Sequence, residues 1–301
     1  MWIFREWSWS LCLCMFLLAS CDDRPKHPDT LGKGEIDISV DETFRPVMEL
    51  QGTVFDSSFP EAKVHIHYKP ESECFKDYFA RKARLILVTR ELSAQEKAVC
   101  EQSKIFPTTL KLARDGIAVV LNNASPDTML DMPTLQGILT GQSSKKYTVV
   151  FDDQGSSTVR FIIDSVLKGA PLGKNVYAAK GNKEVVDYVE KNPGAIGFVG
   201  LGYVSDTVDP NNTGAFINRV KIAAIKNEKT GEFLQPYQAY IALRSYPLTR
   251  SIYYINSESY PGLGTGFANF IAGQRGQLIF FHAHMFPVRS EMVIREAAIK
   301  N

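Results

Sequence analysis

Strand-like and helix-like stretches alternate along most of this chain. Residues 35–40 and 63–68 alternate polar and apolar side chains, as half-buried strands do. Residues 85–88 form a continuous apolar run, which is typical of a strand covered on both faces. Stretches with apolar residues at helical spacing separate these strands. This alternation predicts an α/β fold with a mainly parallel sheet, in which ligands gather at the carboxyl ends of the strands.

Hydroxyl side chains follow one of the predicted strands directly. The apolar run 147–151 leads to Gly155, and then to Ser156, Ser157 and Thr158 at the start of a helical pattern. The first amides of a helix have no partner within it, so the hydroxyls and amides together could seat an anion. Alternatively the hydroxyls only cap the helix, a position in which Ser and Thr are favoured.

Three other strand or helix junctions carry similar polar residues. The strand predicted at 35–40 leads through Thr43 into a helical pattern, and Ser72 stands near the start of another predicted helix. Thr89 and Arg90 directly follow the apolar run 85–88. These residues lie at or just beyond the carboxyl ends of predicted strands, where a ligand is expected.

Two further helices have recognisable starts. Ser93 and Glu96 form a capping box, in which the side chain of each residue bonds the backbone amide of the other. Asn182 is predicted to be the N-cap of a helix that contains Val185 and Val189.

Two segments are candidates for crossings between domains. Residues 110–121 are long for one strand and are interrupted by Asp115 and Gly116, so we expect a connection that leaves a first domain. Residues 245–255 are the candidate return crossing. The folded part, of about 280 residues, exceeds a typical single core. We therefore predict a discontinuous first domain, 35–115 with 250–301, and a second domain, 116–249.

The first twenty residues are predicted to be a signal peptide. Their apolar stretch runs from Trp7 to Leu18, which is short for a membrane span, although an uncleaved signal anchor is an alternative. The ending Leu-Ala-Ser-Cys, residues 18–21, resembles the lipobox of bacterial lipoproteins, which implies that Cys21 is lipidated and holds the chain at a membrane. Residues 21–34 are expected to be a tether.

The charge balance argues against a nucleic-acid partner. The chain has 34 basic and 33 acidic residues, a net charge of +1, and removing the leader leaves that balance unchanged. No basic excess is available to neutralise the phosphates of a strand.

Cys74 and Cys100 either form a disulfide or are two buried thiols. The cysteine spacing does not suit zinc, so we predict no metal site and no cofactor. His65 and His67 are expected to be strand surface residues rather than ligands.

Four stretches, in this order, resemble motifs of one known family. They are Asp-Glu-Thr-Phe at 41–44, Gly-Ser-Ser-Thr at 155–158, Gly-Ala-Ile-Gly-Phe-Val at 194–199 and Tyr-Pro-Leu-Thr-Arg at 246–250. Together they resemble the phosphate-binding proteins of bacterial ABC transporters, which have the type II periplasmic binding fold. The resemblance extends from about Ile36 to Pro287.

The resemblance implies a function without catalysis. Two α/β domains joined by hinge crossings would close on an inorganic oxyanion, phosphate first of all, and present it to an ABC permease in the membrane. The protein would be a monomer in the cell envelope, held by the lipid on Cys21. The residues implied as ligands are Thr43, Phe44, Ser72, Thr89, Arg90, Ser156, Ser157, Thr158 and Arg160.

The chain departs from the family pattern at two positions. Thr89 and Arg90 stand where many members have Ser-Asp, whose aspartate accepts the proton of a protonated phosphate. Asp152 stands where the family has an arginine. Arg90 and Arg160 are the nearest replacements that could contact an oxyanion. The departures leave the oxyanion class intact but weaken the case for phosphate in particular.

Two other functions are compatible with the sequence. A surface lipoprotein could keep the binding fold and serve in sensing or interaction. A phosphohydrolase could use Ser157 as its nucleophile, but it would need a base or metal beside the hydroxyl. The chain has no Gly-x-Ser-x-Gly motif and no histidine in any of the predicted ligand loops.

Overall fold

The computed structural model describes residues 27–205 and 216–289. The predicted signal peptide, Cys21 and the charged tail from residue 290 lie outside these ranges. No helix in the described ranges is both long and apolar enough to cross a membrane.

The main sheet of the described chain has the strand order β2-β1-β3-β12-β4-β8-β6-β7, with β9 and β13 also paired to β4. Its strands are β1 (Gly34–Asp41), β2 (Ala62–Lys69), β3 (Leu85–Val88), β4 (Thr108–Leu121), β6 (Thr148–Phe151), β7 (Val176–Ala178), β8 (Ala195–Gly200), β9 (Lys221–Ile222), β12 (Thr249–Asn256) and β13 (Phe286–Pro287). A small second sheet contains β5 (Met129–Leu130), β10 (Ala224–Lys226) and β11 (Phe233–Leu234).

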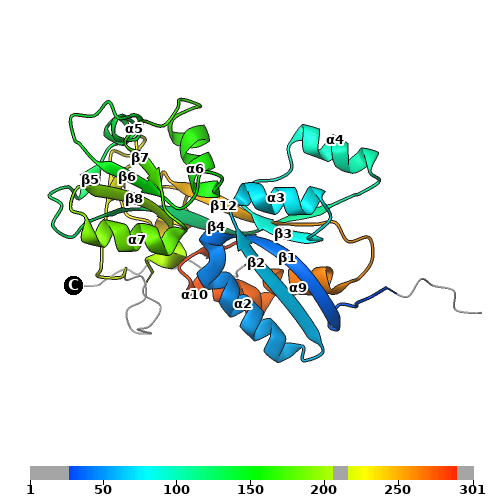
Figure 1. Cartoon of the computed structure of the whole chain (residues 1–301). Helices are drawn as coiled ribbons and strands as arrows, with labels where there is room; N and C mark the ends of the chain where they lie inside the picture. The colour runs from blue at the N-terminus through cyan, green and yellow to red at the C-terminus, as the bar shows by residue number, and fades with distance from the viewer. Residues whose placement is uncertain (1–26, 206–215, 290–301) are drawn as a thin grey trace, which may run out of the picture.

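The main sheet has two parallel halves joined by antiparallel strands. In the first half β1 pairs in parallel with β2 and β3, and in the second half β6 pairs in parallel with β7 and β8. The central strands β4 and β12 run antiparallel to each other and to their outer neighbours. The α/β fold is therefore as predicted, and the mainly parallel pairing applies within each half (Figure 1).

Residues 110–121 connect the first half of the sheet to the second, as expected, but they are not broken at Asp115 and Gly116. They belong to β4, a single strand of 14 residues that serves both halves. The strand pairs with β12 as far as Gly116 and with β8 from Ile117 onward. The Asp-Gly pair does not interrupt the strand, because the Asp115 side chain has a buried partner that is described below. The boundaries proposed for two domains stay a prediction.

Helices cover both faces of each half (Figure 1). They are α2 (Arg45–Ser58), α3 (Glu71–Phe79), α4 (Ala94–Gln102), α5 (Met132–Thr140), α6 (Ser157–Phe161), α7 (Asn182–Lys191), α8 (Gln238–Ala242), α9 (Leu263–Ala272) and α10 (Gln274–His282), with the short turns η1 (Glu42–Phe44), η2 (Ile162–Val166) and η3 (Leu201–Tyr203). The capping box of Ser93 and Glu96 is present at the start of α4.

Each half has its own apolar core. In the first half, Ile38 of β1 packs with Phe55 of α2 and Phe267 of α9. In the second half, Phe151 and Phe198 stack at 4.8 Å between ring centroids. Burial of such side chains contributes about 1.5–3 kcal/mol each, so each half has the apolar burial that a folded unit needs. Cys74 and Cys100 are both buried free thiols, and they lie on the face of the first half opposite the core that contains Ile38.

Candidate functional site

The end of β1 places Thr43 in a buried turn. The Asp41 carboxylate caps η1, because its Oδ1 accepts a hydrogen bond from the Thr43 amide at 3.0 Å. Thr43 is fully buried, and its Oγ1 has no hydrogen-bond partner in the described chain. Phe44, also fully buried, places its ring 5.3 Å from Cζ of Arg250. A buried hydroxyl without a partner is costly, so the Thr43 hydroxyl is suited to bonding a ligand group.

The start of α6 brings the three predicted hydroxyls into the same buried region. Ser156 is the N-cap, and its Oγ accepts from the Val159 amide at 3.2 Å, so the capping interpretation is correct for this residue. Ser157 and Thr158 are fully buried beside it. Their hydroxyl oxygens accept from Nη1 of Arg250 at 2.8 and 3.3 Å. Two of the three hydroxyls therefore face a cation.

Arg250 is the central residue that the sequence reasoning missed. It lies on β12, is 5% exposed, and donates from Nε to Oδ2 of Asp115 on β4 at 3.0 Å. Asp115 is fully buried, which explains why a polar residue interrupts the apolar run of β4. The sequence does contain a signal for this pair. Arg250 ends the Tyr-Pro-Leu-Thr-Arg stretch, and Arg250 and Asp115 each stand in a strand that contains an apolar run.

A second ion pair joins α3 of the first half to α6 of the second. Arg160 donates from Nε to Oε2 of Glu71 at 2.6 Å, and from Nη2 to Oγ1 of Thr89 at 2.6 Å. Thr89 in turn donates from its hydroxyl and its amide to Oε1 of Glu71 at 2.7 and 2.6 Å. Burial opposes ionisation of Glu71, but the Arg160 charge and the hydrogen bonds hold its pKa below the usual value. Thr89 and Arg160 thus lie side by side and both bind the Glu71 carboxylate; their predicted role as anion ligands stays a prediction.

Arg90 lies apart from the other predicted ligands. Its two Nη atoms donate to the Glu96 carboxylate at 2.6 and 2.9 Å, and its Cζ lies 3.7 Å from the Phe75 ring centroid. This guanidinium stabilises the start of α4 rather than contacting Thr43 or Ser157.

Ser72 contacts the glycine that precedes α6. Its amide donates to the Gly155 carbonyl at 3.1 Å, which links the first half to the second. A Cβ on Gly155 would lie 2.2 Å from the Ser72 Oγ, closer than side chains approach. A side chain at position 155 would therefore force the Ser72 hydroxyl to move.

Asp152 is held by Asn182, not by a cation. Asn182 donates from Nδ2 to Oδ2 of Asp152 at 2.9 Å and to Oε2 of Glu42 at 2.7 Å, and its Oδ1 accepts from the Gly200 amide at 3.0 Å. The prediction that Asn182 caps α7 was wrong: Gly181 is the N-cap, and the Asn182 side chain is drawn into this buried network. The start of α7 therefore lies at the carboxyl end of β8.

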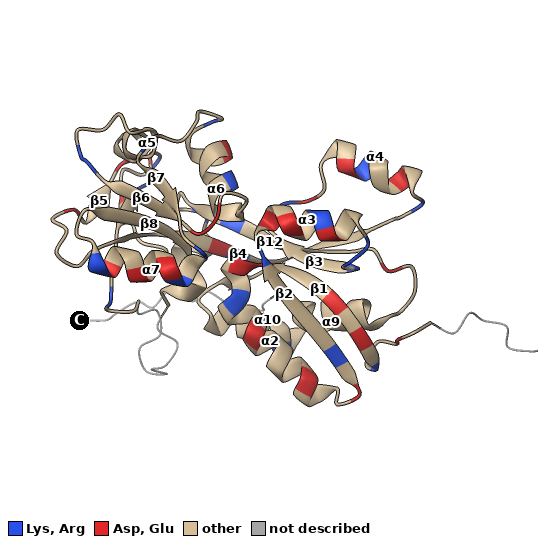
Figure 2. Cartoon of the chain, viewed as in Figure 1, with Lys and Arg blue, Asp and Glu red and all other residues tan. Residues whose placement is uncertain are grey.

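Buried carboxylates outnumber guanidiniums in this region. Burial, together with the charge of Glu71, raises the pKa of Asp41 to about 7. Burial also raises the pKa of Asp152 to about 6, although a hydrogen bond from Ser156 opposes the shift. Oδ2 of Asp41 and Oδ1 of Asp152 are buried, and the hydroxyls of Ser157 and Ser156 lie beside these two carboxyls. Figure 2 shows acidic and basic segments meeting where β4, β12 and α3 converge. Protons can therefore reside here near neutral pH.

The site contains groups for holding an anion and shows no metal centre. Within residues 27–205 and 216–289, no cluster of three His, Cys, Asp or Glu side chains could hold a metal ion. The available groups are the hydroxyls of Thr43, Ser157 and Thr158 around the guanidinium of Arg250. Hydroxyls and a guanidinium donate hydrogen bonds, which suits an oxyanion. The buried carboxylates nearby disfavour an oxyanion with many negative charges.

Comparison with known proteins agrees with this fold. A family model described as a PBP superfamily domain matches residues 25–275. Two proteins from strains of Pseudomonas aeruginosa, both named phosphate-binding protein PstS, are 21% identical over 92% of this chain and 90% of their own length.

Solved structures with similar backbones cover most of the chain. A phosphate ABC transporter substrate-binding protein from Clostridium perfringens, with bound phosphate, aligns with a TM-score of 0.71 and 22% identity over 85% of this chain and all of its own. An ABC-type phosphate transport receptor from Vibrio cholerae aligns with a TM-score of 0.63 and 19% identity over 83% of this chain and 99% of its own. These likenesses concern the fold.

Proposed function

Because this chain belongs to the PBP superfamily, we propose that it captures an inorganic oxyanion between its two halves and catalyses no reaction. Phosphate is the first candidate, since the named relatives are phosphate-binding proteins and both compared structures come from phosphate transport systems. The captured anion would then be passed to an ABC permease for import.

One observation carries this proposal. The α6 hydroxyls of Ser157 and Thr158 bind the buried guanidinium of Arg250, and η1 of the other half packs the Phe44 ring against the same guanidinium. The Oγ1 of Thr43 has no partner there. An oxyanion would accept hydrogen bonds from this hydroxyl and from the α6 hydroxyls, and so satisfy groups that are otherwise buried without bonds.

The buried acids favour a protonated oxyanion. Asp41 and Asp152 each present a buried carboxyl oxygen, which can accept a hydrogen bond from an anion that carries a hydroxyl. Phosphate retains such a hydroxyl at neutral pH, whereas sulfate is fully ionised and has only acceptors. A sulfate ion would therefore meet uncompensated carboxylates, and the site would reject it.

The two halves would act as lobes that close around the anion. The contacts of Ser72 with Gly155 and of Glu71 with Arg160 support a closed arrangement in the present structure. The hinge would lie in β4 and β12, the strands shared by the two halves. The same proposal includes lipidation of Cys21, which would hold the protein at a membrane as a monomer. It also includes the ligand role of each predicted residue.

Calorimetry tests the proposal directly. The chain carrying Cys21→Ser, which cannot receive a lipid, is titrated with phosphate, arsenate and sulfate. We expect saturable heat with phosphate at one site per chain and little heat with sulfate. Absence of heat with every one of these anions would contradict oxyanion capture and favour the sensing or interaction role.

A phosphohydrolase is the less favoured alternative. The Ser157 hydroxyl is hydrogen-bonded by Arg250, a cation that cannot act as a base. The test is release of 4-nitrophenol from its phosphate ester. Release by the parent chain that is lost in Ser157→Ala would favour the phosphohydrolase.

A further inference from the structure

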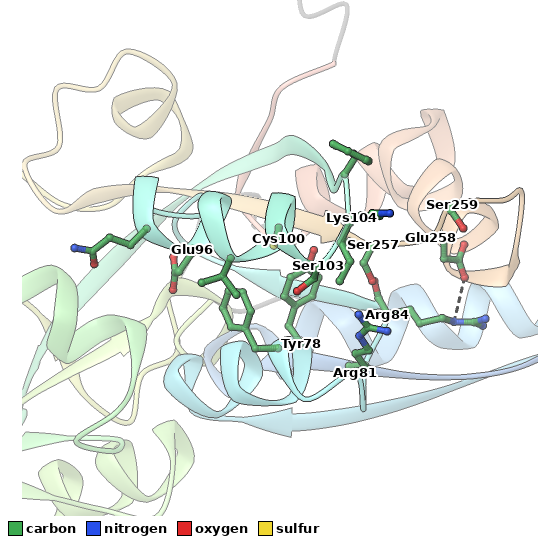
Figure 3. A pocket seen from close by; sticks show the side chains of 16 residues that line it. Tyr78, Arg81, Arg84, Glu96, Cys100, Ser103, Lys104, Ser257, Glu258 and Ser259 are labelled. Carbon is green, nitrogen blue, oxygen red and sulfur yellow. Dashed lines mark hydrogen bonds and ion pairs between the residues drawn. The ribbon is translucent and has the colours of Figure 1, made fainter.

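A large pocket lies in the first half, away from the residues around Arg250. It is enclosed by the ends of α3 and α4 and by the loop that follows β12, and its volume is about 1010 Å³ (Figure 3). Tyr78, Ala83 and Cys100 are buried residues that line it. Pockets that bind small organic molecules have volumes of about 300–1,000 Å³, so this one is large enough for such a ligand.

One wall of the pocket is apolar and open to solvent. Phe79, Val99, Ile105 and Phe106 line it, and Val99 and Phe106 are 49% and 78% exposed. The helix α4 buries only Cys100, so its apolar side toward the pocket lacks cover from the rest of the chain. Such a wall would bind the apolar body of a ligand, because binding removes apolar surface from water.

The charges on the pocket leave an excess of cations. Of its two acidic lining residues, Glu96 pairs with Arg90 at 2.6 Å and Glu258 pairs with Arg84 at 3.4 Å. Glu258 also accepts from the first amides of α9. Both acids are therefore already satisfied.

Two cations at the pocket remain without partners. Arg81 and Lys104 line it, are exposed, and form no side-chain hydrogen bond or ion pair within the described ranges. Each follows the last turn of its helix, with φ of 57° and 55°. Figure 3 shows both side chains at the end of the pocket that also holds Ser103 and Ser257. This end of the pocket is suited to an anionic group.

We propose that this pocket is a second binding site, and that it binds an organic anion with an aliphatic chain, such as a medium-chain fatty carboxylate. The chain lies along Phe79, Val99 and Phe106, and the carboxylate lies between Arg81 and Lys104. The site is independent of the anion site at Arg250, because the two share no residue.

Displacement of a fluorescent probe tests the proposal. The full chain carrying Cys21→Ser is titrated with 1-anilinonaphthalene-8-sulfonate, an apolar molecule with one negative charge, and then with decanoate. We expect probe fluorescence to rise on binding, and decanoate to displace the probe. Decanol, which has the same chain without the charge, is expected to displace it about tenfold less well. No displacement by decanoate, or equal displacement by decanol, overturns the proposal.

Matched variants locate the site. Arg81→Gln with Lys104→Gln is expected to weaken decanoate binding about tenfold, since two unpaired cations are lost. Lys168→Gln with Arg244→Gln is the control: these residues are also exposed and have φ of 54° and 55°, but they lie outside the pocket.

A third variant tests the apolar wall. Val99→Asp places a negative charge on that wall at a half-exposed position and is expected to abolish decanoate binding. Unfolding midpoints near that of the parent chain exclude a general loss of structure. Equal decanoate affinity in the parent, the glutamine pair and Val99→Asp would show that the probe binds elsewhere and would overturn the assignment.

Discussion

Arg250 donates from Nη1 to the Oγ of Ser157 at 2.8 Å, across a separation of 93 residues. Because the hydroxyl oxygen accepts this bond, the hydroxyl proton can be donated to a second group, either the neighbouring Asp41 carboxyl or a ligand. The guanidinium is itself fixed by Asp115 at 3.0 Å, so its orientation does not depend on a ligand. This pair is the most specific structural reason to expect an anion beside Ser157.

Removal of the Ser157 hydroxyl should weaken anion binding. Hydrogen bonds to charged groups contribute about 1.5–3 kcal/mol, so Ser157→Ala is expected to lower phosphate affinity about 10–100-fold in calorimetry. Ser57→Ala is the control, because that exposed hydroxyl donates only to Thr53 in its own helix. Unchanged affinity in Ser157→Ala would place the anion elsewhere.

Thr43→Val should separate ligand binding from folding. The substitution preserves the shape of the side chain and removes Oγ1, which is buried without a partner. The free energy of unfolding without ligand should stay the same or rise by about 1 kcal/mol, since an unsatisfied hydroxyl is lost. Phosphate affinity should fall about tenfold, because the ligand loses a donor. A large loss of stability together with unchanged affinity would give Thr43 a purely structural role.

Stability without ligand should rise as the solution becomes more acidic. Burial raises the pKa of Asp41 to about 7 and that of Asp152 to about 6, from the usual 3.8. Near neutral pH the folded state binds protons that the unfolded state has already lost, so protonation of these two carboxyls stabilises the fold. This contribution is fully present below the pKa of the unfolded state and is lost as the pH rises through the pKa of the folded state. From pH 7.5 to pH 5.5 the gain should be about 2 kcal/mol in denaturant titrations.

Asp41→Asn should remove most of that pH dependence. Asparagine also accepts a hydrogen bond at a helix N-cap, so the bond to the Thr43 amide is expected to persist. At pH 8 the variant should discriminate less between phosphate and sulfate than the parent, since one of the two carboxylate acceptors for the phosphate hydroxyl is absent. A parent-like pH profile in Asp41→Asn would assign the linkage to other groups.

Local signals in the sequence predicted local structure well. The N-cap at Ser156 and the capping box at Ser93 depend on residues three positions apart, and both are present. The long-range contacts could not be read in this way. The pair of Arg250 with Asp115 spans 135 positions, and the pair of Arg160 with Glu71 spans 89.

The misread positions have a common physical cause. Asn182 and Asp115 carry side chains that usually mark caps and turns, and the sequence reasoning treated them so. In the fold their partners come from distant elements: Asn182 binds Glu42 and Asp152, and Asp115 binds Arg250. Burial in a shared polar network outweighed local propensity, since an unpaired buried polar group costs more than a lost cap.

The close contact of Gly155 with Ser72 should control closure of the two halves. A methyl group on Gly155 would meet the Ser72 Oγ at 2.2 Å and its Cβ at 3.3 Å. Gly155→Ala is therefore expected to separate α3 from α6, to weaken phosphate binding about tenfold, and to enlarge the radius of gyration in small-angle scattering. Ser72→Ala removes the atom of closest approach, so adding it to Gly155→Ala should restore part of the affinity. With Ser72→Ala alone as the fourth corner of the cycle, we expect a coupling of about 1 kcal/mol. Additive effects, with a coupling near zero, would mean that this contact does not govern closure.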